Sequence, residues 1–392
     1  MRYLRTFGFL LITALSFSTS SACSRQNSTG NPELSFWVVG GSEGVEARFG
    51  PGLMEAYSRN RSESNRVLFT LAEQPLQEAA ILRRSGLPGR ELQALLASLA
   101  AVRLIQQSDD GRWLTAVPVI TDQRMKAIKE DLRPIALAVG NSVAGDVPQL
   151  MALYDEAKAA SDPPWNDVAH LIIDKFIIDG AFHRAVGTLE RESGVRIHYS
   201  QAQNYITAFF FERGEHFSSF GTNWYLFNEG DAQREVYILH GNLFRRYEIR
   251  MNRHRGDEKF SAALFKLSLD GGLGSLTNQE TEMLERLGWL SGGQLAVPTV
   301  EASTIKALLP TADILGLRGA QVLFENHHVI LDSFGNSPHS QFSAAAGDYI
   351  QVCYHIVFSS ILEELVNAGV LPPMPDSIPE YLGAYIVLGK LY

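Results

Sequence analysis

The chain has 392 residues, of which 45% are hydrophobic and 20% charged, a composition typical of a globular protein rather than a disordered or fibrous one. Its net charge of -9, from 43 acidic and 34 basic residues, disfavours binding to a polyanion such as nucleic acid. The chain contains only two cysteines, Cys23 and Cys353, which excludes a framework of several disulfides.

Residues 1–22 have the pattern of a secretory signal peptide. Arg2 and Arg5 precede an apolar run over residues 7–17, and small residues follow it. The run is shorter than the roughly 20 apolar residues that a membrane-spanning helix needs, so we expect the segment to be removed. Its removal leaves 32 basic and 43 acidic side chains, a net charge of -11.

Two cleavage sites fit the end of this segment. Ser20 and Ala22 satisfy the small-residue rule of ordinary signal peptidase. Ala22 and Cys23 resemble the lipobox of bacterial lipoproteins, although that family usually has leucine where this chain has Ser20. The resemblance implies lipidation of Cys23 and a location in the cell envelope. Residues 23–33 are polar and are expected to form a tether to the folded part.

The first half of the folded part, residues 34–195, is expected to begin with a strand over 35–39. The glycine-rich segment 40–44 that follows lacks the spacing of a phosphate-binding loop and contains the acidic Glu43, so we interpret it as a plain turn. Farther on, the spacing of apolar residues predicts helices over 76–84 and 90–102, joined by a glycine-containing turn.

Strands are expected next, over 104–105 and 113–120, around a hairpin tip at 108–111. Residues 149–192 are predicted to be mostly helical. In that region His170 and Asp174 lie at i, i+4 spacing, which suits an acid–base pair, half of a metal site, or a core histidine oriented by an aspartate. Asp167 precedes this pair, and His183 does not complete a ligand set.

The second half, residues 196–392, is expected to start with aromatic strands between 196 and 252, whose aromatic side chains are typical of a sheet core. It then repeats features of the first half. At an offset of 180 residues, Ala-Val-Pro at 116–118 matches 296–298 and Lys-Ala at 126–127 matches 306–307; at an offset of 185, Leu82, Gly86, Leu99 and Leu104 match Leu267, Gly271, Leu284 and Trp289. A loop shortened by five residues accounts for the change of offset.

The second copy is expected to have a helix over 262–270, a turn over 271–275 and a helix that ends at Leu287. Thr277 and Glu280 have the spacing of a capping box at the start of that helix, and a tight hairpin is expected at 291–294. In both copies the order of helix, turn, helix and hairpin resembles the winged helix-turn-helix superfamily, over roughly 50 residues each. The resemblance implies an α+β fold with two winged-helix-like repeats, helical flanks and antiparallel strand segments.

Members of that superfamily commonly place the second helix in the major groove of DNA. The first copy offers Arg90 beside Glu91 there. The second offers Glu282 and Glu285 with only Arg286, so the charge facing phosphates would have the wrong sign. We therefore take the resemblance as a guide to architecture and expect nucleic acid not to be a partner.

The densest group of polar residues is near the C-terminus: Glu325, His327, His328, Asp332 and His339. In the hairpin that we predict over 321–334, adjacent histidines point to opposite faces and cannot both bind one metal, so a solvated hairpin is the preferred interpretation. We expect no metal and no cofactor. His327, Asp332 and His339 remain the candidate catalytic residues.

After that hairpin, helices are expected over 349–369 and 377–391. The apolar neighbours of Cys353 predict a buried, inert thiol.

These observations favour a non-catalytic envelope lipoprotein that is held to a membrane by its lipid and binds a protein partner or scaffolds an assembly. Two alternatives remain open. The first is an envelope hydrolase with a site near His327, Asp332 and His339. The second is a winged-helix DNA-binding regulator, which requires that residues 1–22 are not an export signal.

Overall fold

The structure is a computed structural model, and it describes residues 33–39, 42–195, 206–212, 216, 220–229, 232–241, 260, 262–264, 266–267, 273–341, 343–373 and 383–391. The expected signal peptide, Cys23 and all of the tether except Glu33 lie outside these residues. The described chain is mixed α+β, as expected.

The chain divides into two compact units. Unit 1 comprises Met1–Ile128, Arg196–Phe217 and Ile330–Cys353, and unit 2 comprises Lys129–Val195, Ser218–Val329 and Tyr354–Tyr392. Each unit therefore contains segments from both halves of the sequence, and its boundaries differ from the halves 34–195 and 196–392 that the repeat suggested.

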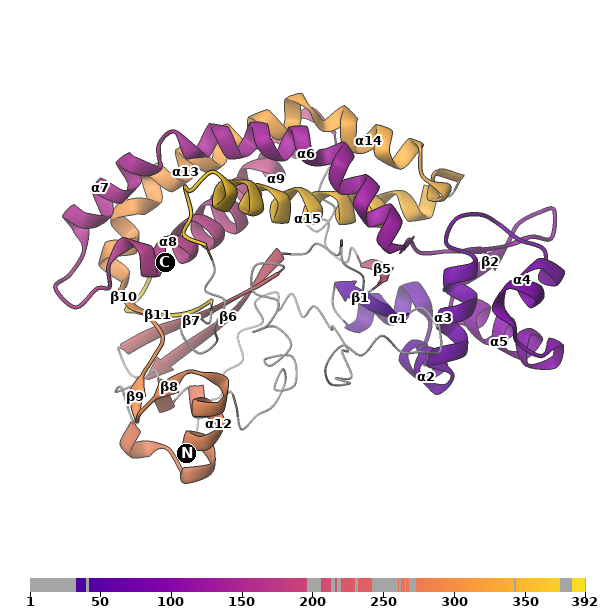
Figure 1. Ribbon diagram of the computed structural model, residues 1–392, viewed down its shortest axis with the longest axis horizontal. Coiled ribbons are helices and arrows are strands. Elements are labelled where there is room, and N and C mark those ends of the chain that lie inside the picture. The colour runs from indigo at the N-terminus through magenta and orange to yellow at the C-terminus, as the bar shows by residue number, and fades with distance from the viewer. Residues whose placement is uncertain are drawn as a thin grey trace. The chain divides into compact units, whose positions relative to one another are not determined.

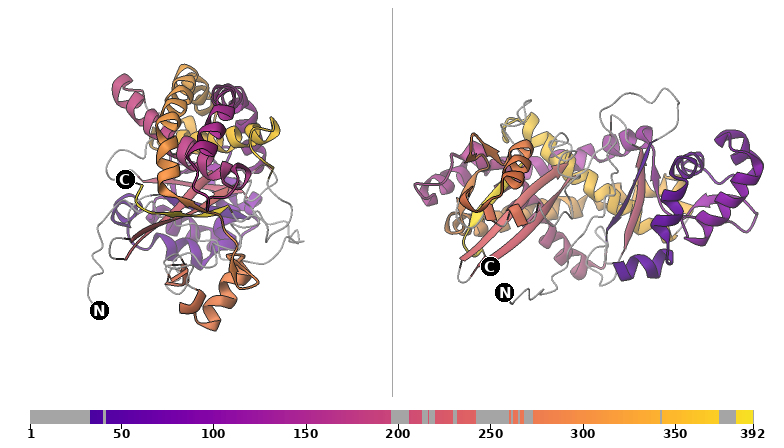
Figure 2. Two further views of the ribbon diagram at one scale, coloured as in Figure 1. Left: turned by 90° about the vertical axis from the view of Figure 1, so that its left-hand side faces the viewer. Right: turned by 90° about the horizontal axis from the view of Figure 1, so that it is seen from below.

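Unit 1 is built on a three-stranded sheet with the order β1-β5-β4, whose strands are β1 (Leu34–Val39), β5 (Thr207–Glu212) and β4 (Val119–Ile120). Strands β1 and β5 are antiparallel, and Phe36 lies opposite Phe210 with the ring centroids 4.3 Å apart. Helices α1 (Ser42–Phe49), α2 (Leu53–Arg59) and α3 (Arg61–Thr70) lie beside these strands and share one hydrophobic core with them (Figure 1). The right-hand view of Figure 2 shows β1 and β5 side by side.

The same core continues into a pair of helices and a hairpin: α4 (Glu78–Ser85), α5 (Gly89–Ala101), β2 (Ile105–Gln107) and β3 (Trp113–Thr115). The two predicted helices and the hairpin tip are confirmed. The single strand predicted over 113–120 is wrong, because β3 ends at Thr115 and β4 pairs in parallel with β5 instead. Pro118, which has no N–H to donate, lies between them, and its carbonyl oxygen accepts from the Phe210 amide at 2.8 Å.

Unit 2 is built on a four-stranded sheet with the order β10-β11-β7-β6, whose strands are β10 (Thr299–Glu301), β11 (Ala384–Leu388), β7 (Ala232–Gly241) and β6 (Phe220–Glu229). The strands predicted within 196–252 are confirmed where that region is described, whereas residues 243–251 lie outside it. The helix predicted over 377–391 is wrong, because 384–388 form a central strand. A short apolar run fits either structure, and the pairing on both sides decides it.

The two faces of this sheet carry different layers (Figure 1). One face packs on α12 (Asn278–Leu287) and on a hairpin made by β8 (Leu290–Ser291) and β9 (Gln294–Leu295), through a core that includes Val236, Ile238 and Trp289. A short 3₁₀ turn, η4 (Leu273–Ser275), precedes α12. The capping box at the start of α12 is confirmed, since the Thr277 side chain accepts from the Glu280 amide and Glu280 bonds back to the Thr277 amide.

The other face carries a helical layer: α7 (Val147–Ala157), α8 (Trp165–His170), η1 (Leu171–Phe182), α9 (His183–Ser193) and α13 (Ala302–Glu325). The predicted helical region 149–192 is confirmed, with a break between α7 and α8. The twelve residues of η1 form a π-helix, which the sequence did not suggest. Helix α13 packs on η1, α9 and α7.

Two long helices have residues in both units, α6 (Asp122–Ala144) and α15 (Ser343–Asn367). Between α13 and α15 lie α14 (His327–Gly335) and a 3₁₀ turn, η5 (Pro338–Gln341). The hairpin predicted over 321–334 is therefore wrong. The buried residues Leu323, Ile330 and Ser333 follow a helical spacing, with a break at Asn326. The expected turn at 40–44 is also partly wrong, because α1 already begins at Ser42.

The two stretches related by the sequence repeat make the same backbone hydrogen bonds. After α5, the Leu104 amide donates to the Leu99 carbonyl at 3.0 Å; after α12, the Trp289 amide donates to the Leu284 carbonyl at 2.8 Å. The bonds Ala116 N to Leu104 O and Ala296 N to Trp289 O, both 2.9 Å, correspond in the same way. Each helix is followed by a residue with positive φ, Arg103 at 55° and Gly288 at 81°.

The correspondence extends to the sheets. Each Ala-Val-Pro segment leads into a short strand, β4 or β10, which pairs in parallel with a strand that lies far ahead in sequence. The Pro298 carbonyl accepts from the Ile386 amide at 3.0 Å, as Pro118 accepts from Phe210. Parallel strands need a long crossover, and here it is helical: α6 to α9 lie between β4 and β5 in sequence, and α13 to α15 lie between β10 and β11. The expected antiparallel strand segments are present, for example β1 with β5 and β6 with β7, whereas the parallel pairs β4 with β5 and β10 with β11 were not expected.

Within the described ranges, no helix is both long enough and apolar enough to cross a bilayer.

Candidate functional site

The three candidate catalytic residues have separate surroundings. His327, at the start of α14, has its Nδ1 atom 2.6 Å from the carbonyl oxygen of Phe324, and Asp332 is exposed one and a half turns later on the same helix. His339 is buried in the η5 turn. Across the described parts of the chain, no three His, Cys, Asp or Glu side chains are close enough to hold a metal ion.

His339 belongs to the packing of unit 1. Its ring lies 6.0 Å from that of Tyr349 on α15, and it hydrogen-bonds to the backbone of Val119 in β4. Burial lowers the pKa of His339 to about 4, helped by the nearby positive charge of Arg124 and opposed by the Val119 bond. His339 is therefore a neutral core histidine at neutral pH. Its position connects α15 to the sheet.

A buried carboxylate also connects α15 to the sheet of unit 1. Asp348 of α15 is fully buried and accepts hydrogen bonds from the Ala208 amide of β5 at 3.2 Å and from Arg48 Nη1 at 2.9 Å. The other nitrogen of the Arg48 guanidinium binds the second carboxylate oxygen, so the pair is bidentate. Helix α1, strand β5 and helix α15 are thereby joined within unit 1.

In unit 2 the structure brings His170 and Asp174 together, as one of the interpretations of their spacing predicted. Nδ1 of His170 is 2.9 Å from Oδ2 of Asp174, and Nε2 is 2.9 Å from the carbonyl oxygen of Pro372. A carbonyl oxygen can only accept, so Nε2 carries a proton. The Nδ1–Oδ2 contact then needs a further proton, either on the imidazole or on the carboxyl group. This buried pair thus holds its proton in a structural contact.

The pKa values of this pair agree with that geometry. Burial by itself would lower the pKa of His170, but the charge and hydrogen bond of Asp174, with the Pro372 carbonyl, raise it above its ordinary value. Burial raises the pKa of Asp174. The second oxygen of Asp174, Oδ1, is buried and has no hydrogen-bond partner among the residues that the structure describes.

Sequence reasoning missed the polar residues that follow on the π-helix. Lys175 Nζ lies 2.7 Å from Asp179 Oδ2 and 5.8 Å from the centre of the Tyr237 ring of β7. The hydroxyl of Tyr237 donates to Glu235, a fully buried carboxylate, at 2.5 Å. Nδ1 of His183 lies 3.4 Å from the Tyr354 hydroxyl oxygen. Burial lowers the pKa of His183. Spacing alone could not reveal this group, because its members come from η1, α9, β7 and α15.

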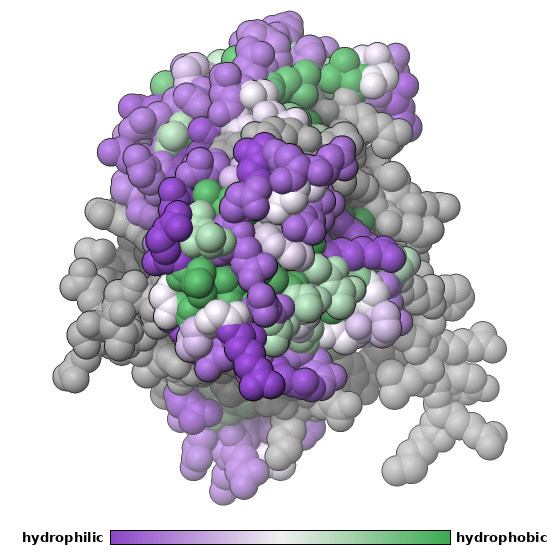
Figure 3. All heavy atoms as spheres, turned by 90° about the vertical axis from the view of Figure 1, so that its right-hand side faces the viewer, coloured by the Kyte–Doolittle hydropathy of each residue, from purple (hydrophilic) through white to green (hydrophobic). Residues whose placement is uncertain are grey.

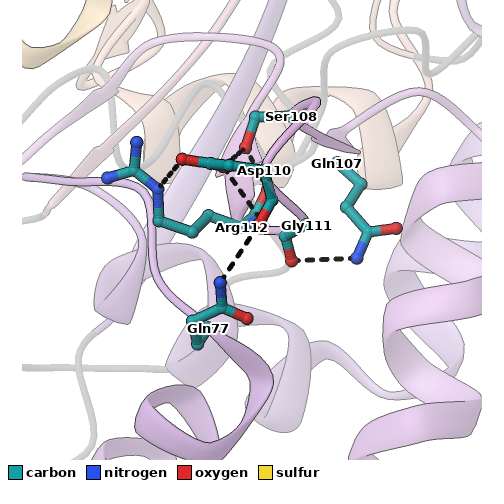
Figure 4. A network of polar contacts seen from close by, with 6 residues as sticks. All are labelled: Gln77, Gln107, Ser108, Asp110, Gly111 and Arg112. Carbon is teal, nitrogen blue, oxygen red and sulfur yellow. Dashed lines mark hydrogen bonds and ion pairs between the residues drawn. The ribbon is translucent and has the colours of Figure 1, made fainter.

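The hairpin of unit 1 has an exposed tip that is held by polar contacts (Figure 4). The Asp110 carboxylate accepts from the Ser108 hydroxyl at 2.5 Å and from Arg112 Nε at 2.7 Å, and its backbone carbonyl accepts from Gln77 Nε2 at 3.2 Å. The Ser108 bond is the main reason that the pKa of Asp110 is lowered. In unit 2 the corresponding hairpin has only a two-residue tip, Gly292 and Gly293.

Cys353 is buried, as predicted. Cys23 lies outside the described residues.

No family model matches the chain, and no match was found among curated proteins or solved structures.

Proposed function

We propose that the chain is a non-catalytic, envelope-anchored lipoprotein that binds a protein partner or scaffolds an assembly. In this proposal residues 1–22 are removed, Cys23 carries the lipid, and residues 23–33 connect the lipid to the folded part.

We also propose that residues 76–120 and 262–300 are two copies of a winged-helix-like unit. The support is the set of matching backbone bonds after α5 and α12, the positive φ at Arg103 and Gly288, and the two Ala-Val-Pro segments that lead into parallel strands. A residue with positive φ after a helix is a common stop signal, so that feature is weak by itself. Both Ala-Val-Pro segments also continue into a strand that pairs in parallel, and agreement over this length is harder to explain by chance.

The observation that carries the proposed function is the use of the buried ionisable groups. His170, His339, Asp348 and Glu235 each bond to backbone or to a neighbouring side chain and thereby join elements of the fold. Because those groups stabilise the packing of the fold, we assign the binding role to the exposed surfaces. The separate surroundings of His327, Asp332 and His339 give no support to a hydrolase.

The charge of the described helices disfavours the DNA-binding alternative. Glu282 and Glu285 are exposed on α12, the counterpart of α5. A partner rich in phosphate would meet these carboxylates as well as a chain with a net negative charge.

Chemical cross-linking in intact cells tests the proposed function. We expect the wild-type chain to fractionate with membranes and to give a discrete cross-linked species with another protein. Cys23→Ala should release the chain from the membrane fraction and weaken that species, because the anchor no longer concentrates it there. A chain that stays in the membrane fraction without any cross-linked partner would contradict the binding role.

A further inference from the structure

Three arginines in unit 1 differ from the others there. The side chains of Arg83, Arg84 and Arg90 make no hydrogen bond or ion pair with any residue that the structure describes, and all three residues are exposed. The remaining arginines of the described part of unit 1 all have partners: Arg48, Arg59, Arg61, Arg66, Arg103, Arg112 and Arg124.

The three unpaired arginines flank one turn. Arg83 and Arg84 lie in the last turn of α4, and Arg90 lies in the first turn of α5. Leu82 is 36% exposed, and its Cδ1 atom lies 4.0 Å from the position that a Cβ would take on Gly89, so this side chain rests against the start of α5. We call Leu82, Arg83, Arg84 and Arg90 the basic turn. Seen from the side on which Figure 1 labels α4 and α5, hydrophobic side chains form an island within a mostly hydrophilic face (Figure 3).

The fold does not explain all of these charges. Arg83 and Arg84 at the C-terminus of α4 favour its helix dipole, but Arg90 lies at the N-terminus of α5, where a positive charge is unfavourable. The matching positions of the second copy, 185 residues later, are Ser268, Leu269 and Ser275, none of which is charged. The charge of the basic turn is therefore a feature of the first copy alone.

Three classes of anionic partner are conceivable, and their chemistry separates them. Three phosphate contacts give a salt dependence with a log–log slope of only about -3, whereas DNA-binding proteins commonly make about 6–10 such contacts. An anionic membrane would have to attract, through three side chains, a chain whose net charge is -11 once residues 1–22 are removed. An acidic protein segment needs only a local match, because guanidinium groups bind carboxylates in a bidentate manner and Leu82 offers an apolar contact between them.

We propose that the basic turn is a docking site for an acidic protein segment that carries an apolar side chain between its carboxylates. This inference rests on the proposed protein-binding function and names the chemical class of the partner. Arg83, Arg84 and Arg90 bind the carboxylates, and Leu82 packs against the apolar side chain.

Fluorescence anisotropy with the detergent-solubilised full chain tests the site. The probes are a short labelled peptide with one leucine flanked by glutamates, the same peptide with serine in place of leucine, and one with lysines in place of the glutamates. A DNA duplex and vesicles containing phosphatidylglycerol represent the other anionic partners. The variant is R83Q/R84Q/R90Q. The matched control, R59Q/R133Q/R184Q, removes the same charge from arginines whose side chains are 69%, 65% and 54% exposed.

We expect the acidic leucine peptide to bind the wild type and the control alike, and the R83Q/R84Q/R90Q variant to bind it at least about tenfold more weakly. The serine peptide should bind less tightly and the lysine peptide should not bind. Equal binding by the variant, no binding by the wild type, or a tighter interaction of the basic turn with DNA or vesicles would overturn the proposal.

Cross-linking in cells separates this failure from failure of the proposed function. A cross-linked partner that persists in R83Q/R84Q/R90Q would leave the binding function standing and remove only the assignment of the basic turn.

Discussion

At the scale of single residues, Gly316 of α13 has the least room for a side chain among the described glycines. A Cβ there would lie 2.4 Å from the Phe182 amide nitrogen and 2.5 Å from the Ala181 Cβ. Since most of these contacts are to backbone, side-chain rotation cannot relieve them. We predict that Gly316→Ala lowers the free energy of unfolding by about 3 kcal/mol in urea titrations. Leu317→Ala, on the exposed side of the same helix, should cost less than about 1 kcal/mol. Similar losses of unfolding free energy for both variants would contradict the close contact of α13 with η1 at Gly316.

His339 gives a pH dependence on the acid side. Its pKa is lowered from 6.5 to about 4 in the folded chain, so the folded state binds fewer protons than the unfolded state between these values. Stability should therefore fall as the pH drops from 6.5 to about 4, by about 3 kcal/mol from this residue. In urea titrations at several pH values, the free energy of unfolding of His339→Gln should change less steeply with pH over that range. Some slope should remain, because the pKa of buried His183 is lowered as well. An unchanged slope would show that His339 is accessible to protons when folded.

The His170–Asp174 pair gives the opposite dependence. The raised pKa of His170 means that the folded state keeps a proton that the unfolded chain loses, so stability present below pH 6.5 should be lost as the pH rises through the folded-state value. Asp174→Asn removes the charge that holds this proton. We predict that the variant is less stable and that its melting temperature no longer declines with pH over this interval. If the melting temperature of the variant declines with pH as steeply as that of the wild type, other titratable groups cause the decline.

At the scale of elements, Gly180 supports the π-helix η1. A Cβ at this position would lie 2.9 Å from the carbonyl oxygen of Lys175, five residues earlier. In an ordinary α-helix, Gly→Ala stabilises by about 0.5–1 kcal/mol, as we predict for Gly140→Ala in α6, where no atom lies within 4 Å. Gly180→Ala should instead destabilise the chain, by about 1 kcal/mol. Thermal melts of the two variants provide the test, and a gain in stability from both would argue for an α-helical η1.

Elements with a strong local pattern could be predicted from the sequence. The apolar stripe of Leu92, Leu95, Leu96 and Leu99 is buried in α5, and the Thr277–Glu280 capping box starts α12. Both patterns involve residues that are close in sequence, so they predict local structure without knowledge of the tertiary contacts.

Elements that tertiary pairing decides could not be predicted in this way. Residues 384–388 are a strand because β10 and β7 lie on either side of them, and 327–335 are a helix although their apolar residues also fit a hairpin. The π-helix has no spacing signature that distinguishes it from an α-helix in so apolar a segment as 171–182. The polar group around Tyr237 could not be predicted for the same reason, because Glu235, Tyr237 and Lys175 come together only when η1 packs on β7.

At the scale of the whole molecule, the two stretches related by the sequence repeat, 76–120 and 262–300, belong to different compact units. The repeat in the sequence predicted that two stretches would be built alike, and their matching bonds agree with it. It did not predict that each compact unit would include segments from both halves, because offsets between similar residues carry no information on which segments pack together. The copies differ, because the first has a longer hairpin tip and the arginines of the basic turn, and these differences are the reason that we propose a docking site on the first copy.

The proposed export and lipid anchoring would determine which partners the exposed surfaces can meet, and the mature N-terminus tests both proposals. Mass spectrometry of the chain from the membrane fraction should find a first residue Cys23 that carries acyl groups, with residues 1–22 absent. Recovery of the chain from the cytoplasm with Met1 and residues 1–22 intact would contradict the account and return the DNA-binding regulator as the better explanation.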